Sequence, residues 1–332
     1  MTEAVERARL IDRDRLRELS RRSDLRGWLQ TGSHFAAIAF TGALLYQLRG
    51  SWLAAPVFVL HGVLINFLYA GQHELSHSTV FRTRRLNEVF GRLIGFILIT
   101  PRDADWIQHR AHHRWTQRWR QDGELYRAPF TLGSYLARLS GLEYWQANLT
   151  ALVLYALGEV REPYVAADEK PVVIREARLH ILGYGVIAGA AAWAHSWAPL
   201  AFWLAPMLLT KAAHQLQNTI EHLGLPHTDD ITQNTRSVRT NALMRWMGWN
   251  MQYHTAHHAF PSVPCHRLPA LHREIFTARR AEPPTMTYLG FQAAVITALA
   301  RQGEAEWPND RAWIVAPAKA ARTGEAAMGA RR

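Results

Sequence analysis

Cysteine is almost absent from this chain of 332 residues, in which Cys265 is the single example. Zinc sites built from thiolates and iron–sulfur clusters both need several cysteines, so neither kind of centre is well supported. The first 26 residues also lack the apolar core of a signal peptide, because they are mixed in charge and rich in arginine. A single reduced cysteine agrees with a site that faces the cytoplasm.

Long apolar runs are present, although the average hydropathy of the whole chain resembles that of a soluble protein. Four runs approach the roughly 20 residues that a helix needs to cross a bilayer. They are Trp28 to Leu48, Trp52 to Ala70, Leu179 to His195, and Ala198 to Gln217. A fifth run, Val89 to Thr100, is too short to span and predicts a re-entrant or interfacial helix. Because the four long runs form two tight pairs with almost no charge between members, we predict transmembrane hairpins rather than buried helices of a soluble protein.

Positive charge is concentrated outside these runs. The chain has 38 Lys and Arg against 27 Asp and Glu, which gives a net charge of +11. The positive-inside rule therefore places the N-terminal tail and the long central and C-terminal segments in the cytoplasm. No nucleic-acid fold signature accompanies the charge, so we expect anionic membrane lipids or an acidic electron-donor protein as partners, and no nucleic acid.

Histidine is concentrated in short clusters at the predicted membrane ends. The clusters are HELSH with His73 and His77, HRAHH with His109, His112 and His113, NTIEH with Asn218 and His222, and HTAHH with His254, His257 and His258. Residues three and four apart share one helix face, so each cluster is expected to aim its imidazoles at a single point. Zinc is usually satisfied by four ligands, so eight or nine converging imidazoles call for two metal ions. The predicted topology brings all four groups to the cytoplasmic face.

Local patterns predict the helices that carry these clusters. The second span is expected to continue into HELSH without a break, and a new helix carrying HRAHH is expected after Pro101. One helix over Asn241 to His258 would carry HTAHH, ended by the prolines that follow. His214, Asn218 and His222 are spaced by one helical turn each, which predicts a single stripe at the end of the fourth span.

These patterns together predict an all-α integral membrane protein. Four transmembrane helices in two hairpins, with the short re-entrant or interfacial helix, would support a cytoplasmic helical cap that holds a histidine-rich site for two metals. We expect a cytoplasmic amphipathic segment over residues 1–27 and a single membrane-embedded domain with its cap over residues 28–316. Residues 317–332, which are rich in Ala, Gly and Arg, are expected to be disordered.

Acidic residues near the clusters are candidates to orient the histidines. Imidazole suits iron, zinc, copper and nickel, and neutral ligands leave the charge of two metal ions uncompensated. A carboxylate can accept the second ring N–H of a liganding histidine. The candidates are Glu74, Asp103, Asp105, Asp122, Glu124 and Glu221. For each of them, a helix-capping or solvent-exposed role is the alternative.

In their order and spacing, HELSH, HRAHH and HTAHH resemble the three histidine boxes of the integral-membrane fatty acid desaturase and hydroxylase superfamily. NTIEH is similar to the extra Asn-x-x-x-His element of acyl-CoA desaturases, and the glutamate before its histidine also occurs in alkane hydroxylases. The resemblance runs from about Trp52 to His272, which is roughly two-thirds of the chain.

The resemblance implies a non-haem di-iron centre that activates O2 with two external electrons and attacks an unactivated C–H bond of a fatty acyl chain. It implies that all nine histidines bind iron and that Asn218 holds a metal through water. Because the chain has no haem-binding cytochrome extension and no rubredoxin-like cysteine pairs, electrons would come from a separate ferredoxin, rubredoxin or cytochrome b5-like protein. A bacterial inner membrane is the expected location, with the site facing the cytoplasm.

Desaturation of an acyl chain is the leading interpretation of these motifs. The alternative is hydroxylation of an alkyl chain, or oxidation of another lipophilic substrate such as a carotenoid, since both outcomes begin with hydrogen abstraction. The FP after HTAHH is more typical of desaturases, and NTIEH is more typical of hydroxylases. A membrane metal transporter is a different class, but transport sites lie near the bilayer midplane and these clusters lie at the predicted membrane ends.

Overall fold

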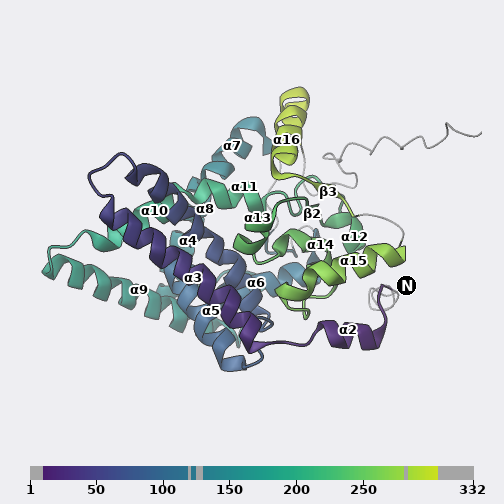
Figure 1. The fold of residues 1–332 in the computed structure, drawn as a ribbon, viewed down its shortest axis with the longest axis horizontal. Coiled ribbons are helices and arrows are strands. Elements are labelled where there is room, and N and C mark those ends of the chain that lie inside the picture. Colours follow the sequence, from purple (N-terminus) through teal and green to yellow (C-terminus); the bar gives the residue numbers. More distant parts are fainter. Residues whose placement is uncertain (1–9, 119–120, 125–129, 280–282, 306–332) are drawn as a thin grey trace, which may run out of the picture.

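The computed structural model describes residues 10–118, 121–124, 130–279 and 283–305, and within them the chain is almost entirely helical (Figure 1). This agrees with the predicted all-α class. Two two-stranded pairs are the exceptions. They are β1 (Phe130–Thr131) antiparallel to β4 (Glu304–Ala305), and β2 (Ser237–Val238) parallel to β3 (Thr285–Met286). The tail predicted to be disordered, residues 317–332, lies outside the described residues.

Three helices are long enough to cross a bilayer at about 1.5 Å per residue. They are α3 (Asp24–Gln47), α4 (Ala54–Ser76) and α9 (Lys170–Trp193). Among the described residues, α4 is the one helix that is also apolar enough, and half of its most apolar stretch is buried. Length and composition therefore support one of the four predicted spans, and the other three remain predictions.

The segment predicted as the fourth span is divided. It consists of the π-helix η1 (Leu200–Leu204), α10 (Ala205–Leu209) and α11 (Lys211–Asn218). Pro206 has no N–H to donate to the carbonyl oxygen of Phe202, four residues earlier. His61 of α4 fills this place, because its Nε2 lies 2.9 Å from that oxygen. The mid-span position of His61 is thus explained by a bond to the neighbouring irregular helix.

The remaining helices are shorter. They are α2 (Arg13–Leu19), α5 (Arg84–Leu98), α6 (Arg102–Trp115), α7 (Leu132–Ser140), α8 (Leu142–Leu157), α12 (Ile231–Asn234), α13 (Ala242–Met247), η2 (Met251–Tyr253), α14 (His254–Ala259), η3 (Cys265–Arg267), α15 (Leu268–Arg279) and α16 (Tyr288–Gln302). In Figure 1, α3, α4, α5 and α9 lie together on one side, and β2, α12, α14 and α15 lie on the other. The largest buried apolar cluster joins the two sides, with Leu68 and Leu75 of α4 in the same cluster as Leu271 and Ile275 of α15.

The helices that carry the histidine clusters differ in how closely they follow the sequence patterns. As predicted, α4 runs unbroken to Ser76, with His73 in its last turn, and α6 begins directly after Pro101. The predicted stripe is wrong for His222, because α11 ends at Asn218 and turns follow.

The single helix predicted over Asn241 to His258 is also wrong. Trp249 and Asn250 have positive φ angles of 49° and 61°, and they separate α13 from η2 and α14. Trp249 is fully buried, and its Nε1 donates to Nδ1 of His34 on α3 at 3.0 Å. Tertiary packing of the indole therefore accompanies the break, and α14 starts afresh at His254.

Candidate metal centre

All nine predicted histidines are brought together, in two groups. The five-histidine group contains His73, His77, His109, His113 and His257, and the four-histidine group contains His112, His222, His254 and His258. Within each group the candidate ligand atoms all lie within 4.8 Å of one another. The number of groups equals the number of metal ions that the histidine count called for.

Two of the clusters supply both groups, so the expectation that each cluster aims at a single point is wrong for them. On α6, His109 and His113 belong to one group and His112 to the other. Consecutive residues of an α-helix differ in direction by about 100°. Neighbouring imidazoles such as those of His112 and His113 therefore diverge, while residues four apart point the same way. On α14, His257 is separated from His254 and His258 in the same manner.

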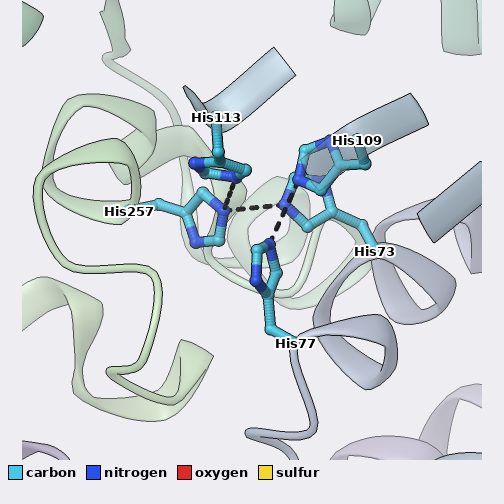
Figure 2. A group of neighbouring side chains, drawn as sticks. All are labelled: His73, His77, His109, His113 and His257. Atoms are coloured by element: carbon cyan, nitrogen blue, oxygen red, sulfur yellow. Dashed lines mark hydrogen bonds between the residues drawn. The ribbon is translucent and has the colours of Figure 1, made fainter. Parts of the chain in front are cut away.

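The spacing of ring nitrogens in the five-histidine group matches a shared ion (Figure 2). Two imidazole nitrogens bound at about 2.1 Å from one ion, at right angles, lie about 3.0 Å apart. The Nε2–Nε2 distances are 2.8 Å for His73 and His257, 3.1 Å for His77 and His109, and 3.1 Å for His113 and His257. Rings from α4, α6 and α14 thus present Nε2 atoms to a common point.

The four-histidine group is arranged in a way that suits a cation. Nδ1 of His112 donates to the Asp122 carboxylate at 2.8 Å, and Nδ1 of His222 faces the carbonyl oxygen of Asn234 at 3.2 Å. Both partners only accept, so a neutral ring carries its proton on Nδ1 and a lone pair on Nε2. Nε2 of His222 nevertheless lies 3.1 Å from Nε2 of His112 and 2.8 Å from Nε2 of His254. One proton cannot satisfy all three nitrogens, whereas one metal ion can.

His258 gives a second, independent indication that the four-histidine group suits a metal ion. Its Nδ1 lies 3.3 Å from the hydroxyl of Thr116, whose own proton is donated to the carbonyl oxygen of His112. The hydroxyl therefore accepts from Nδ1, which leaves a lone pair on Nε2. That nitrogen is buried and has no hydrogen-bond partner among the described residues. An orphaned imidazole lone pair inside a ring of three others fits a metal ion.

Four of the six candidate acids lie beside histidines of the two groups. Oε1 of Glu124 is 2.7 Å from Nδ1 of His109, and Oδ1 of Asp122 is 2.8 Å from Nδ1 of His112. Oε1 of Glu74 is 3.3 Å from Nδ1 of His257, and Oε1 of Glu221 is 3.8 Å from Nδ1 of His254. The hydrogen bonds from His109 and His112 to Glu124 and Asp122 fix the orientation of those two rings and raise their basicity as ligands.

The other two candidate acids have different partners. Asp103 pairs with Arg92 and Arg102, and Asp105 accepts from Tyr69 and Gln72. Two partners of the histidines were not predicted, namely the hydroxyl of Thr116 and the carbonyl oxygen of Asn234. The second is a backbone atom, so no residue type in the sequence could have indicated it.

The charges around α6 favour a cation at this place. Burial alone would raise the pKa of Glu124, but the neighbouring His112 and His109 outweigh it and bring that pKa to about 2. Burial alone would lower the pKa of His112, but Asp122 and Glu124 reverse the effect and raise it to about 9. The two carboxylates therefore stabilise positive charge between the rings, which a bound metal ion would also supply.

Helix α6 is held at its start by a residue far along the chain. Its N-cap residue, Pro101, makes no side-chain capping bond. The buried carboxylate of Glu176, on α9, accepts from the backbone N–H of Arg102 at 3.0 Å and of Asp103 at 2.7 Å. An acidic group at a helix N-terminus accepts hydrogen bonds from the unpaired N–H groups there. It is also attracted by the positive end of the helix dipole. Glu176 thus anchors the helix that carries three of the nine histidines.

Replacing Glu176 with glutamine is expected to destabilise the protein by about 1–2 kcal/mol and to speed metal release. The amide keeps one acceptor but turns an NH2 group toward a backbone N–H. Thermal denaturation and the transfer of added metal to a chelator measure the two effects. Glu169→Gln is the matched control, because Glu169, the N-cap residue of α9, pairs with the half-exposed Arg110 of α6 at 2.6 Å. Equal behaviour of the two variants would contradict the anchoring role.

Comparison with known proteins bears on the same residues. A family model described as fatty acid desaturase matches residues 50–290, which include all nine histidines. The chain is 24% identical over 236 residues to the sphingolipid delta(4)-desaturase DES1 of Drosophila melanogaster, covering 68% of this chain and 67% of that protein. It is 23% identical over 261 residues to the Delta(5) fatty acid desaturase fat-4 of Caenorhabditis elegans, covering 69% of this chain and 58% of the relative. Because the family model matches residues 50–290, which are most of the chain, this chain belongs to the fatty acid desaturase family.

Proposed function

We propose that the protein is a membrane-embedded oxidoreductase that uses two iron ions, O2 and external electrons to desaturate a fatty acyl or similar aliphatic chain. The observation that carries the proposal is the convergence of imidazole lone pairs in the four-histidine group, beside a second group of five. Imidazole suits iron, and the family is one of desaturases. When bound, two redox-active ions would supply and share the electrons that activate O2.

The proposed reaction balances with an external electron donor. Two adjacent carbons of the chain each lose one hydrogen and form a double bond. These two hydrogens, together with two protons and two electrons from the donor, reduce one O2 to two water molecules. We propose a separate ferredoxin, rubredoxin or cytochrome b5-like protein as the donor, since the basic character of the chain favours an acidic partner.

We propose different roles for the residues of the site, according to their positions. The nine histidines would hold the ions, and Asp122 and Glu124 would keep two of the rings oriented through their Nδ1 atoms. Asn218, the last residue of α11, lines a cavity beside Glu124, and we propose that its amide holds a metal through water.

Exposed apolar side chains support a membrane location. Leu179, Leu182 and Val186 of α9 are 59%, 64% and 63% exposed, and Phe40 of α3 is 68% exposed. Large apolar side chains exposed along long helices are suited to contact lipid. We also propose four spans in two hairpins, with the site on the cytoplasmic side of a bacterial inner membrane, and residues 28–316 as one domain.

Expression of the intact chain tests this function through two measurements. Metal analysis of the purified protein should find about two iron ions per chain. Gas chromatography with mass spectrometry of the cellular lipids should find a new double bond, absent from cells that express a double variant, His112→Ala with His257→Ala. A new hydroxyl group instead would favour the alternative hydroxylase. If iron-loaded protein gives neither a new double bond nor a new hydroxyl group, that result would contradict an acyl substrate.

A further inference from the structure

One face of α9 carries two arginines followed by exposed aliphatic side chains. An open groove of about 460 Å³ runs along the N-terminal half of the helix, and its lining is Pro171, Ile174, Arg175, Arg178, Leu179 and Leu182. Residues three and four apart share one helix face, so these side chains form a single stripe. Val186, four residues beyond Leu182, extends the stripe and is exposed. The surface thus changes from guanidinium groups to aliphatic side chains within about one turn.

Arg178 is held in place by the end of the neighbouring helix. Its Nε donates to the carbonyl oxygen of Ala156, in the last turn of α8, at 2.9 Å. Its two NH2 groups have no hydrogen bond or ion pair with any residue that the structure describes. A side chain that is already ordered loses less conformational entropy when it binds a ligand. The guanidinium of Arg178 is therefore prepared to donate to an acceptor outside the protein.

Arg175 is exposed and makes no ion pair or hydrogen bond in the described part of the chain. It lies three residues before Arg178, so the two positive side chains are neighbours on the helix surface and repel each other. Glu176 is the one acid within α9, and it bonds two backbone N–H groups of α6 instead. Glu169, the N-cap residue, pairs with Arg110. An anion between Arg175 and Arg178 would relieve a repulsion that no carboxylate of this helix relieves.

We infer that this stripe binds one anionic phospholipid of the cytoplasmic leaflet. Phosphate oxygens would accept from Arg175 and Arg178, since guanidinium groups donate to phosphate in a matching fork. The acyl chains would lie along Leu179, Leu182 and Val186, which a free phosphate ion would leave uncovered. A zwitterionic lipid fits less well, because its ammonium group would meet two positive charges. Basic residues next to the cytoplasmic end of a span attract anionic lipids.

The inference rests on the membrane location proposed above, in which the third span begins at Leu179 from the cytoplasmic side. It also connects the lipid to the metal centre. Glu176 lies between the two arginines in the sequence but is buried on another face of α9, where it anchors the start of α6. A lipid that orders this part of α9 would therefore stabilise the attachment of α6, without touching a histidine.

Two phospholipids with the same acyl chains test the site. Native mass spectrometry of the purified full chain in detergent measures binding of dioleoylphosphatidylglycerol, which is anionic, and of dioleoylphosphatidylcholine, which is zwitterionic. The first molecule of phosphatidylglycerol should bind at least about tenfold more tightly, because each basic residue near a membrane surface contributes about fivefold. It should also raise the melting temperature more than phosphatidylcholine does. An excess of inorganic phosphate should not displace it.

Variants of the two arginines locate the site. Arg175→Gln with Arg178→Gln should lower the preference for phosphatidylglycerol to less than about twofold. Arg175→Gln alone keeps the bond between Arg178 and Ala156, so it should leave the fold intact and lower the preference by about fivefold. The matched control is Arg273→Gln with Arg301→Gln, which removes the same charge from exposed positions on α15 and α16 and should keep the full preference.

The outcomes separate this inference from the proposed function. Equal binding of the two lipids, an unchanged preference in the double variant of α9, or an equal loss in the control pair would each overturn the inference alone. Displacement by inorganic phosphate would overturn the assignment to a lipid. Recovery of the chain in the soluble fraction of cells would overturn the proposed membrane location, and the inference with it. Selective binding by iron-loaded protein that oxidises no lipid would overturn the proposed function and support the lipid site.

Discussion

Replacing either His112 or His257 with alanine is expected to abolish turnover and lower the iron content of the purified protein. His112 is one of only four imidazoles in its group, and His257 contacts two others, with Nε2 2.8 Å from His73 and 3.1 Å from His113. Changes to residues that only hydrogen-bond to a metal ligand reduce affinity or activity by roughly 10–100-fold. Removal of a residue that binds the metal directly should have a larger effect. Iron analysis and the yield of oxidised lipid measure the result.

Both variants should remain in the membrane fraction, because the apolar helices are untouched. His195→Ala is a suitable control, since His195 is exposed after the end of α9 and belongs to neither group. Full iron retention in both His112→Ala and His257→Ala would show that the two groups do not bind the metal.

The second large effect is expected when Asp122, whose carboxylate is fully buried, is replaced with asparagine. Its Oδ1 accepts from Nδ1 of His112 at 2.8 Å and from the backbone N–H of Glu124 at 2.9 Å, and its Oδ2 accepts from the backbone N–H of Gln117 at 2.8 Å. In Asp122→Asn one of these acceptors becomes an NH2 group. We expect metal affinity of the four-histidine group to fall by about 10–100-fold.

Titration of the metal-free variant with Fe(II) separates the two groups. The variant should fill the five-histidine group first and the four-histidine group only at higher iron concentration, whereas the unaltered protein should fill both groups together. Asp229→Asn is the matched control, because Asp229 is largely exposed and pairs with Arg118 at 2.7 Å. Identical titrations of Asp122→Asn and the control would show that the carboxylate does not support the site.

Residue types and short spacings were enough to predict which histidines gather, because each cluster holds its members within one turn. They were not enough to assign them to groups, since the direction of each ring depends on how α6 and α14 are rotated against α4. The turn at Trp249 and Asn250 sets that rotation for α14, and it depends on the burial of an indole against α3. The rotation of α14 therefore depends on a contact between residues more than two hundred positions apart in the sequence, and not on the local pattern.

The cavity beside Glu124 was beyond sequence reasoning for a related reason. Asp105, Tyr144 and Gln215 line the cavity but lie far apart in the chain, and each alone resembles an ordinary polar residue near a membrane end. The groups that the fold gathers beside the centre are mostly polar. Only the packing of α4, α6, α8 and α11 reveals this.

The sharing of α6 and α14 between the two histidine groups would also govern how a two-metal centre assembles. An ion bound by His109, His113 and His257 would fix the rotation of both helices, and would thereby place His112, His254 and His258. The entropy of ordering these helices is then lost once, on the first binding event, and the second ion binds a prepared site. Iron loading should therefore be cooperative, so that chains holding a single ion are scarce at half saturation.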